Sequence, residues 1–407
     1  MFAPACYPPA QPEAIVNAKL AVAMLEKGWE IDVITNPRAD YAWYGSNCFA
    51  SWSSLLEHLT PVSEYPSTYS HIPLIIKSFL FSKLIGKRPL WSVPAFKVAL
   101  SLASRKRYDF IISRANPCTA HLAALLLHKQ TNVPWIANWN DPMPPYKQPY
   151  PYGKGPTHPM TVQDSLFYFR IAKSCNWHTF PCDRLQRYIC SYLPSDVAHK
   201  SSVIPHIAMH RFSTPSSQHD GFLLLYAGNL KSPRSPQKLL EGLRKFLTTH
   251  PMSPPIKMRF IIDNGDSVYD FARAYGVQQY VVVDGPKPYE QMAAEFAGAD
   301  VLMVSEASIP EGIYFPSKFV DYVQSGKPIL ALSPMTGTIA DFISTHGGGI
   351  LADCASSDSI AQAIATLYEH WKNGSLGLLS SHTLFDLFSE DRVLTSYEEI
   401  FSRLSLS

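Results

Sequence analysis

The sequence lacks the features that mark membrane, secreted and zinc-ribbon proteins. Its longest purely aliphatic stretch, near residues 122–127, is far shorter than the roughly 20 residues that span a bilayer. Its seven cysteines form no C-x-x-C pair, and no basic segment followed by an apolar one opens the chain. We therefore predict a cytoplasmic protein with reduced thiols.

The sequence also lacks a strong net charge. Its 35 Lys and Arg residues nearly balance 33 Asp and Glu residues, for a formal charge of +2, which argues against nucleic acid as a partner. The charge is unevenly divided, because residues 1–205 hold 20 basic and 12 acidic residues (+8) and residues 206–407 hold 15 and 21 (−6). We expect the first half to meet an anionic surface or acceptor.

Two common nucleotide motifs are absent as well. No G-x-G-x-x-G follows an expected strand, and no G-x-x-x-x-G-K-[ST] occurs. What the chain does have is an apolar fraction of 46% over 407 residues, which predicts a globular protein of two domains.

Strand-like and helix-like segments alternate through both halves of the chain. In the first half we expect strands at 29–35, 109–113, 133–139, 177–181 and 202–207, and helices at 14–27, 119–129 and 161–174. In the second half we expect strands at 222–227, 257–262, 280–283, 301–304 and 328–332, and helices at 236–248, 268–275, 290–297, 318–324, 359–371 and 387–404. This alternation predicts an α/β fold with two doubly wound, Rossmann-like domains, each a parallel sheet covered on both faces.

A polar stretch rich in Pro and Ser, at residues 211–220, marks the expected linker. We therefore predict an N-terminal domain at 1–210, a C-terminal domain at 211–385, and a final helix at 386–407 that packs back on the first domain. Ligands of open parallel sheets bind beyond the carboxyl ends of the strands. Two such domains would place the site in a cleft where they face each other.

The most informative segment lies at residues 305–328. It contains a strand end, a polar loop, a helix opened by Pro316 and Ser317, and a glycine cap at Gly326. The free N–H groups of a helix start attract anions, and Lys318 adds a positive charge. Asp321 follows about one turn later, where a carboxylate can accept two vicinal hydroxyls. A solvated loop with an ordinary helix cap is the alternative interpretation.

This segment has the pattern E-G-x-x-x-P-S-K-x-x-[ED]-Y-x-x-x-G-K-P-[IV]-L, which resembles the donor-site segment of GT-B glycosyltransferases of family 4. The resemblance implies that Glu311 faces the donor sugar and that Asp321 holds the ribose. It also implies that amides at the helix start bind the diphosphate, namely those of Ser317, Lys318 and Phe319, and it places Pro316 beside them in the donor site. The sequence departs from the family by having Asp for the second acidic residue and nine residues between the pair instead of seven.

Residues 225–240 resemble the first strand and turn of the family's donor domain. There a glycine lets the backbone approach the ligand, and Gly228 and Asn229 stand at that place in this sequence. Basic residues of the family clamp the leaving diphosphate. Arg234 is the best candidate for that clamp, because a guanidinium binds two phosphate oxygens at once. Lys231 and Lys238 are weaker candidates, and solvated surface lysines are the alternative for both.

Two segments of the first half resemble the family too. Tyr7-Pro8-Pro9 before a helix is similar to the opening loop, with Pro8 expected at the acceptor, although the short lead before it leaves either an abbreviated first strand or an upstream start. Residues 134–142 resemble a P-W-[IV]-A-D-F-R-D-P-W stretch of bacterial polysaccharide transferases. The resemblance implies acceptor contacts from Asn138, Asn140 and Asp141; a polar turn closed by Pro142 is the alternative.

A basic stretch at residues 71–107 contains no acidic residue and alternates cations with apolar side chains. Its cations are Lys77, Lys83, Lys87, Arg88, Lys97, Arg105, Lys106 and Arg107. Such a segment predicts peripheral contact with an anionic membrane at its inner face. Core-facing helices with solvated lysines are an equally good interpretation.

Together the resemblances imply a retaining glycosyltransferase that moves a sugar from a nucleoside diphosphate sugar to a glycan or lipid-linked acceptor in cell-surface polysaccharide assembly. Arg234, Glu311 and Lys318 are the implied catalytic residues. No metal and no resident cofactor are expected, because basic residues and a helix start neutralise the diphosphate. A non-catalytic GT-B-like subunit and a nucleotide-sugar 2-epimerase are the alternatives.

Overall fold

The computed structural model describes residues 1–7, 11–37, 50–64, 88–212, 219–250 and 256–406. The chain divides into two compact units. The first contains Met1–Ile207 and Glu390–Ser407, and the second contains Ala208–Ser389. The boundaries between the units thus fall after Ile207 and Ser389. The boundaries expected from the sequence were after residues 210 and 385.

The first unit is built on a parallel sheet. Its strands are β1 (Val33–Thr35), β2 (Leu59–Pro61), β3 (Ile111–Ala115), β4 (Trp135–Trp139), β5 (Trp177–Phe180) and β6 (Ser201–Val203). Strand β2 pairs with β1, and β3, β4, β5 and β6 follow one another. Phe2 closes the gap between β1 and β3, because it bridges to Ile34 on one side and to Ser113 on the other. The residues around Phe2 therefore occupy the position of a strand between β1 and β3.

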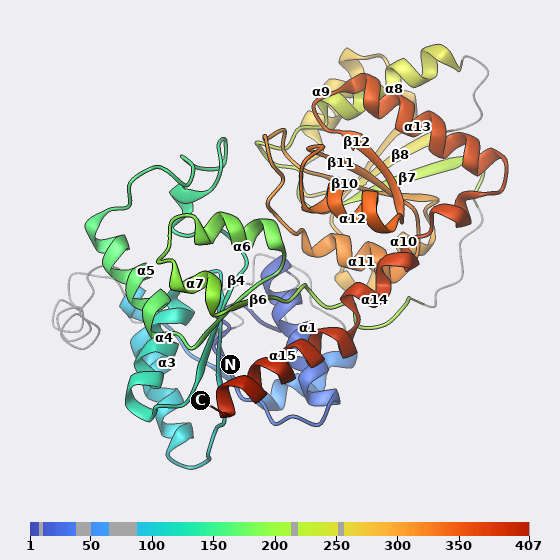
Figure 1. Cartoon of the computed structure of the whole chain (residues 1–407). Coiled ribbons are helices and arrows are strands. Elements are labelled where there is room, and N and C mark those ends of the chain that lie inside the picture. The colour runs from blue at the N-terminus through green and yellow to red at the C-terminus, as the bar shows by residue number, and fades with distance from the viewer. Residues whose placement is uncertain (8–10, 38–49, 65–87, 213–218, 251–255, 407) are drawn as a thin grey trace. The chain divides into compact units, whose positions relative to one another are not determined.

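Helices cover this sheet (Figure 1). They are α1 (Pro12–Glu26), α3 (Arg88–Ala103), α4 (Thr119–Thr131), α5 (Val162–Ser174), α6 (Asp183–Cys190), α7 (Asp196–His199) and α15 (Glu390–Ser405), with short 3-10 helices η2 (Ala50–His58) and η4 (Pro145–Lys147). Helix α15 stacks Phe401 on Phe110 at 4.3 Å between ring centroids. The last helix of the chain thus completes the core of the first unit.

The second unit is a six-stranded parallel sheet. Its strands are β7 (Phe222–Ala227), β8 (Ile256–Ile261), β9 (Val281–Asp284), β10 (Val301–Ser305), β11 (Ile329–Ser333) and β12 (Gly349–Asp353). The strand order is β12-β11-β10-β7-β8-β9. Because β7 and β10 are neighbours, the crossovers run in one direction before β10 and in the other after it. This is the doubly wound order, and it confirms the predicted fold class.

Helices lie on both faces of the second sheet (Figure 1). They are α8 (Gln237–Thr249), α9 (Asp266–Ala274), α10 (Tyr289–Ala297), α11 (Ser317–Ser325), α12 (Thr338–His346), α13 (Ser357–Lys372) and α14 (Phe385–Phe388), with 3-10 helices η5 (Gln278–Tyr280), η6 (Leu376–Leu379) and η7 (Ser381–Leu384). On one face, Leu224 and Tyr226 of β7 are buried with Leu243 of α8, Val268 of α9 and Ile364 of α13. Alternate residues of β7 therefore supply the core beneath these three helices.

The edge of the second sheet differs from the prediction. No strand was predicted after residue 332, yet Gly349 begins strand β12, directly after Gly347 and Gly348. A Cβ on Gly349 would lie 2.0 Å from the carbonyl oxygen of Ile329, so the glycine allows the two strands to approach. Strand β12 is short and only partly buried, which weakens its sequence signal.

In the described part of the chain, none of the helices combines the length and the hydropathy that crossing a membrane requires. The six described cysteines, Cys6, Cys118, Cys175, Cys182, Cys190 and Cys354, are free thiols.

Candidate functional site

The candidate site of the second unit lies where β7 and β10 end side by side. Strand β7 ends at Ala227 and continues into Gly228, and β10 ends at Ser305 and continues into Glu306. This is the point at which the crossover direction of the sheet reverses, and loops that leave in opposite directions open a ligand site there.

Gly228 makes the turn after β7. Its φ of +95° is a conformation that side chains strongly disfavour, and its N–H donates to the carbonyl of Ile261 at 2.9 Å. An added Cβ would lie 3.0 Å from the Nζ of Lys318. The glycine thus brings the backbone directly beneath the ammonium group of Lys318.

Lys318, from the first turn of α11, reaches back over the end of β7. Its Nζ donates to the carbonyl of Ala227 at 2.7 Å and to the hydroxyl of Tyr226 at 3.2 Å, and it lies 4.4 Å above the Tyr226 ring. Burial, and after it the charge of Arg234, lower the pKa of Lys318 to about 7 against the attraction of Asp321. A bound anion at this position would restore the charged form of the lysine.

Arg234 lies in the loop between β7 and α8. Its Nε atom is buried and has no hydrogen-bond partner among the described residues. An unsatisfied buried donor costs about 1–3 kcal/mol. Arg234 and Lys318 lie close enough for the guanidinium charge to depress the pKa of the lysine. Two cations therefore converge on the end of β7, an arrangement suited to an anionic ligand.

The start of α11 supplies the amides that the sequence predicts. Pro316 precedes the helix and has no side chain that can cap it, so the first N–H groups belong to Ser317 and Lys318. The N–H of Phe319 donates to the carbonyl of Pro316 at 3.0 Å, and its ring packs 6.0 Å from that of Phe315. The amide of Phe319 is thus already engaged, which narrows the predicted anion site to Ser317 and Lys318.

Asp321 is buried one turn further along α11, with 6% of its surface exposed. Its Oδ1 accepts a hydrogen bond from the hydroxyl of Tyr289 at 2.7 Å. Tyr289 opens α10, so this contact ties the starts of two neighbouring helices together. A ribose at Asp321 would have to share the carboxylate with Tyr289.

Glu306 is an acidic residue that the sequence analysis missed. Its side chain is 8% exposed, its Oε2 accepts from the hydroxyl of Ser333 at 2.5 Å, and its Oε1 is buried without a partner. Burial raises the pKa of Glu306 to about 7, although Ser333 and Arg234 oppose the rise. An acidic residue directly after the buried strand Val-Leu-Met-Val-Ser was the available signal.

Glu311, the predicted sugar-facing residue, is half-buried in the loop between β10 and α11. The next residue, Gly312, pairs with Gly337 in an isolated bridge and accepts a hydrogen bond from the Thr338 N–H at 2.7 Å. A Cβ on Gly312 would lie 3.2 Å from the Oε2 of Glu306. The loop is therefore held against Glu306, and Glu311 stands next to that contact.

The remaining predicted donor residues are exposed or paired with other side chains. Asn229 and Lys231 are exposed, and the Asn229 carbonyl accepts from the Tyr226 hydroxyl at 2.8 Å. Lys238 forms an ion pair with Glu241 at 2.8 Å one turn along α8. A pocket of about 210 Å³ lies beside these residues, with Lys238, Ser305, Glu306 and Ser308 in its wall.

The predicted acceptor residues of the first unit follow β4. Asn138 is 2% exposed and donates to the Thr179 hydroxyl at 3.2 Å, and its Oδ1 is buried without a partner. The Nδ2 of Asn140 donates to the Oε1 of Glu13 at 2.7 Å. Burial raises the pKa of Asp141 to about 6. Pro8, the fourth predicted residue, lies outside the described residues.

Three further polar residues lie in this group, and none of the three was predicted from the sequence. Arg114, at the end of β3, donates from Nε to the Oδ1 of Asn17 at 2.6 Å. Asn17 donates to the carbonyl of Ala5 at 2.7 Å. Burial raises the pKa of Glu13 to about 7, against the opposing charge of Arg114. The carboxyl ends of β3 and β4 therefore carry a connected polar cluster, the equivalent place to the site of the second unit.

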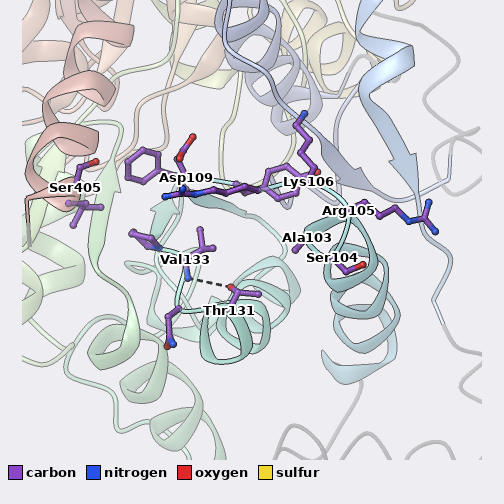
Figure 2. Close-up of a pocket in the computed structure, with 14 residues that line it drawn as sticks. Ala103, Ser104, Arg105, Lys106, Asp109, Thr131, Val133 and Ser405 are labelled. Atoms are coloured by element: carbon purple, nitrogen blue, oxygen red, sulfur yellow. Dashed lines mark hydrogen bonds between the residues drawn. The ribbon is translucent and has the colours of Figure 1, made fainter.

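A wide pocket of about 740 Å³ lies at the opposite edge of the first sheet, where β3 and β4 begin (Figure 2). Arg105, Lys106 and Arg107 of the basic stretch line it, together with Thr131 and Val133. Lys106 pairs with Glu30 at 2.6 Å and with Asp32 at 3.6 Å, so its charge is partly compensated. Lys97 is exposed, whereas Lys77, Lys83 and Lys87 lie outside the described residues.

The comparisons with known proteins agree with this geometry. Residues 211–374 match the model of the family Glycosyl transferases group 1. The match lies within the second unit, which is therefore similar to a glycosyl transferases group 1 domain. This match supports a transferase, and it covers the segment that includes Gly228, Arg234, Glu306 and α11.

Solved structures resemble the chain over nearly its whole length. A glycosyltransferase from Rickettsia africae ESF-5 has a TM-score of 0.66 at 12% identity, with 96% of this chain and 94% of that chain covered. Anabaena Alr3699/HepE, solved with UDP and glucose, has a TM-score of 0.64 at 14% identity, with 97% of both chains covered. A sucrose-phosphate synthase from Thermosynechococcus elongatus has a TM-score of 0.64 at 14% identity, with 98% and 94% covered. These likenesses show the GT-B glycosyltransferase fold.

No curated protein matches the chain. Among the described residues, no three His, Cys, Asp or Glu side chains are placed to hold a metal ion.

Proposed function

We propose that this chain is a retaining glycosyltransferase of family 4, which moves a sugar from a nucleoside diphosphate sugar to a hydroxyl of a glycan or lipid-linked acceptor. The convergence of Arg234 and Lys318 at the start of α11, inside the segment that matches the family Glycosyl transferases group 1, carries this proposal. The HepE structures with UDP and with UDP-glucose support a nucleotide-sugar donor for this fold.

The proposed donor site works through fixed positive charge. Negative charge grows on the diphosphate as the glycosidic bond breaks, and the Arg234 guanidinium, the Lys318 ammonium and the amides of Ser317 and Lys318 would meet it. These groups supply the neutralisation that a metal provides in other enzymes, so we propose that the reaction needs no metal ion. Exhaustive treatment with a chelator tests this, and we expect the enzyme to keep its full activity afterwards.

The proposed acceptor site is the polar cluster of the first unit. Its carboxylates and amides, including Asp141 and Asn140, are suited to hydroxyl groups, because each oxygen accepts one hydroxyl proton. We further propose a role in cell-surface polysaccharide assembly at the inner face of the membrane, where the basic stretch would meet anionic lipid.

Radiolabelled UDP-, GDP- and dTDP-sugars test the proposed activity directly. We expect release of free nucleotide from one of them, accelerated by acceptor, and a product that keeps the anomeric configuration of the donor. Binding of nucleotide without any turnover would instead identify a non-catalytic nucleotide-sugar-binding subunit. Interconversion of the sugar at C2 would identify an epimerase.

A further inference from the structure

Glu306 lines the pocket of about 210 Å³, and within the described part of the chain its carboxyl group has only one of its two oxygens in a hydrogen bond. One oxygen, Oε2, accepts from Ser333, and the other, Oε1, is buried and has no partner. Glu306 is held rigidly, because its N–H donates to the carbonyl of Leu332 at 2.9 Å and Gly312 packs against the carboxyl. A buried polar atom left without a partner on a fixed strand end points to a ligand.

The contacts of Ser333 indicate the protonation state of this carboxyl. The Ser333 Oγ lies 2.5 Å from the Oε2 of Glu306 and 3.1 Å from the carbonyl oxygen of Pro334. A hydroxyl has one proton and can donate to only one of these oxygens. Without a ligand, both contacts can be hydrogen bonds at once only if Glu306 is protonated on Oε2 and donates to Ser333 while Ser333 donates to Pro334. With an anion at Oε1, the proton can lie on Oε1 instead, and Ser333 then donates to Oε2.

Arg234 is the nearby cation, yet it does not neutralise Glu306 by direct pairing. Its charge acts on the carboxyl, but its Nε has no hydrogen-bond partner among the described residues. Glu306 and Arg234 are therefore electrostatic neighbours, and each has one buried polar atom without a partner in the part of the chain that the structure describes. A phosphate oxygen satisfies both of them only if the carboxyl acts as a donor, because an ionised carboxylate would repel it.

We propose that Glu306 is a neutral carboxylic acid in the donor site, and that in the complex its proton lies on Oε1 and is donated to the diphosphate beside Arg234, while Oε2 accepts from Ser333. This inference rests on the proposed function and deepens it, since it makes donor binding dependent on a proton. Binding then weakens with rising pH, because the carboxyl must take up a proton from solvent before it can receive the anion.

Other titratable groups face the same place and must be separated from Glu306. Arg234 comes from the loop after β7, Lys238 from α8 and Cys354 from the end of β12, and Lys318 lies beyond Arg234. Burial lowers the pKa of Lys318 to about 7, so its own loss of charge also weakens anion binding at high pH. The β-phosphate of the nucleotide titrates in the same range. Comparing the wild type with a Glu306 variant cancels both effects, because Lys318 and the β-phosphate titrate in both experiments.

The test is calorimetric titration of the full-length protein with UDP, GDP and dTDP between pH 6 and pH 8.5, taking the nucleotide that binds most tightly. Glu306→Gln is the decisive variant, because an amide occupies the same space and donates a hydrogen bond at every pH. We expect wild type and Glu306→Gln to bind equally at pH 6. At pH 8 we expect the wild type to bind about tenfold more weakly, since one linked proton changes affinity tenfold per pH unit.

Asp353→Asn, which changes a carboxyl at the end of β12 in the same sheet, is the matched control and should keep the wild-type dependence on pH. Titration in two buffers of different ionisation enthalpy should give an additional proton uptake in the wild type relative to Glu306→Gln. An equal pH dependence in the two proteins, or weaker binding by Glu306→Gln at pH 6, would overturn the inference while leaving the proposed function intact. A wild type that binds none of the three nucleotides would contradict both.

Ser333→Ala keeps the inference testable if Glu306→Gln does not fold. The Ser333 hydroxyl stabilises the ionised carboxylate, so its removal should move the loss of nucleotide affinity to higher pH. An unchanged midpoint in a folded Ser333→Ala protein would also overturn the inference.

Discussion

The Nδ2 of Asn140 donates a hydrogen bond of 2.7 Å to the Oε1 of Glu13, joining the end of β4 to the first turn of α1 across 127 residues of chain. Glu13 is further contacted by Asn17, at 3.5 Å. Two amides thus hold one carboxyl in place at the carboxyl edge of the first sheet. This constraint leads to a prediction about pH.

Glu13→Gln should remove a pH dependence from the stability of the first unit. Burial raises the pKa of Glu13 to about 7 from 4.5, so the folded state holds its proton more tightly than the unfolded state. The resulting stabilisation is complete below pH 4.5 and is lost as pH rises through 7, to a total of up to about 3 kcal/mol. At pH 8 the variant should be the more stable protein in urea unfolding. A stability difference that stays constant from pH 4.5 to pH 8 would contradict this.

Arg234→Ala should lower kcat about a hundredfold while raising the KM for donor much less. The guanidinium meets charge that is greatest in the transition state, and loss of one such donor costs about 3 kcal/mol. Arg234→Lys should recover only part of the rate, because an ammonium does not bridge two oxygens. Lys238→Ala is the control, since Lys238 is paired with Glu241 and should be dispensable. A folded Arg234→Ala protein with the parent rate would reassign the clamp to another cation.

Asp321→Asn should weaken binding of nucleoside diphosphate by about 1–3 kcal/mol, the range for a hydrogen bond to a charged group. The companion variant Tyr289→Phe removes the hydrogen bond at 2.7 Å and keeps the carboxylate charge. If Asp321 holds the ribose, Tyr289→Phe should affect binding less than Asp321→Asn does. Calorimetry decides between them, and unchanged affinity in Asp321→Asn would exclude the ribose contact.

Gly349→Ala should destabilise the second unit by about 1–3 kcal/mol or more, because the new methyl group would overlap the Ile329 carbonyl oxygen at the β11–β12 contact. Gly377→Ala is the control. Gly377 has an ordinary φ and open space around it, so a change within about 0.5 kcal/mol is expected. Thermal unfolding of both variants checks the order. Equal losses would mean that the close approach of the two strands contributes nothing.

The basic stretch should bind anionic vesicles and release them in salt, because electrostatic screening shortens to about 3 Å at 1 M. The double variant Arg105→Glu and Arg107→Glu should sediment less with anionic vesicles than the wild type. Lys106→Ala should matter less, since Glu30 and Asp32 already compensate its charge. Equal sedimentation with neutral and anionic vesicles would refute the electrostatic contact.

The sequence by itself determined the fold class, because hydrophobic period and glycine turns are local signals. Strand β7 was predicted with the bounds that the structure has, at Phe222–Ala227, and α11 within a residue at each end. Buried parallel strands have continuous apolar runs in the sequence, so the alternation of strand and helix can be recognised without any knowledge of contacts. Strand β12 and helix α12 were not predicted, and in β12 only Ala352 is fully buried, so its apolar run is weak.

Only the tertiary structure decided which polar side chains meet. Glu306 and Ser333 are joined by a hydrogen bond across 27 residues, Lys318 reaches Ala227 across 91, and Asn140 reaches Glu13 across 127. Such contacts arise from the order of strands in each sheet, which no local pattern records. The burial that raises the pKa of Glu306 comes from the same packing. The sequence therefore located the segments of the site, and the strand order determined which residues form it.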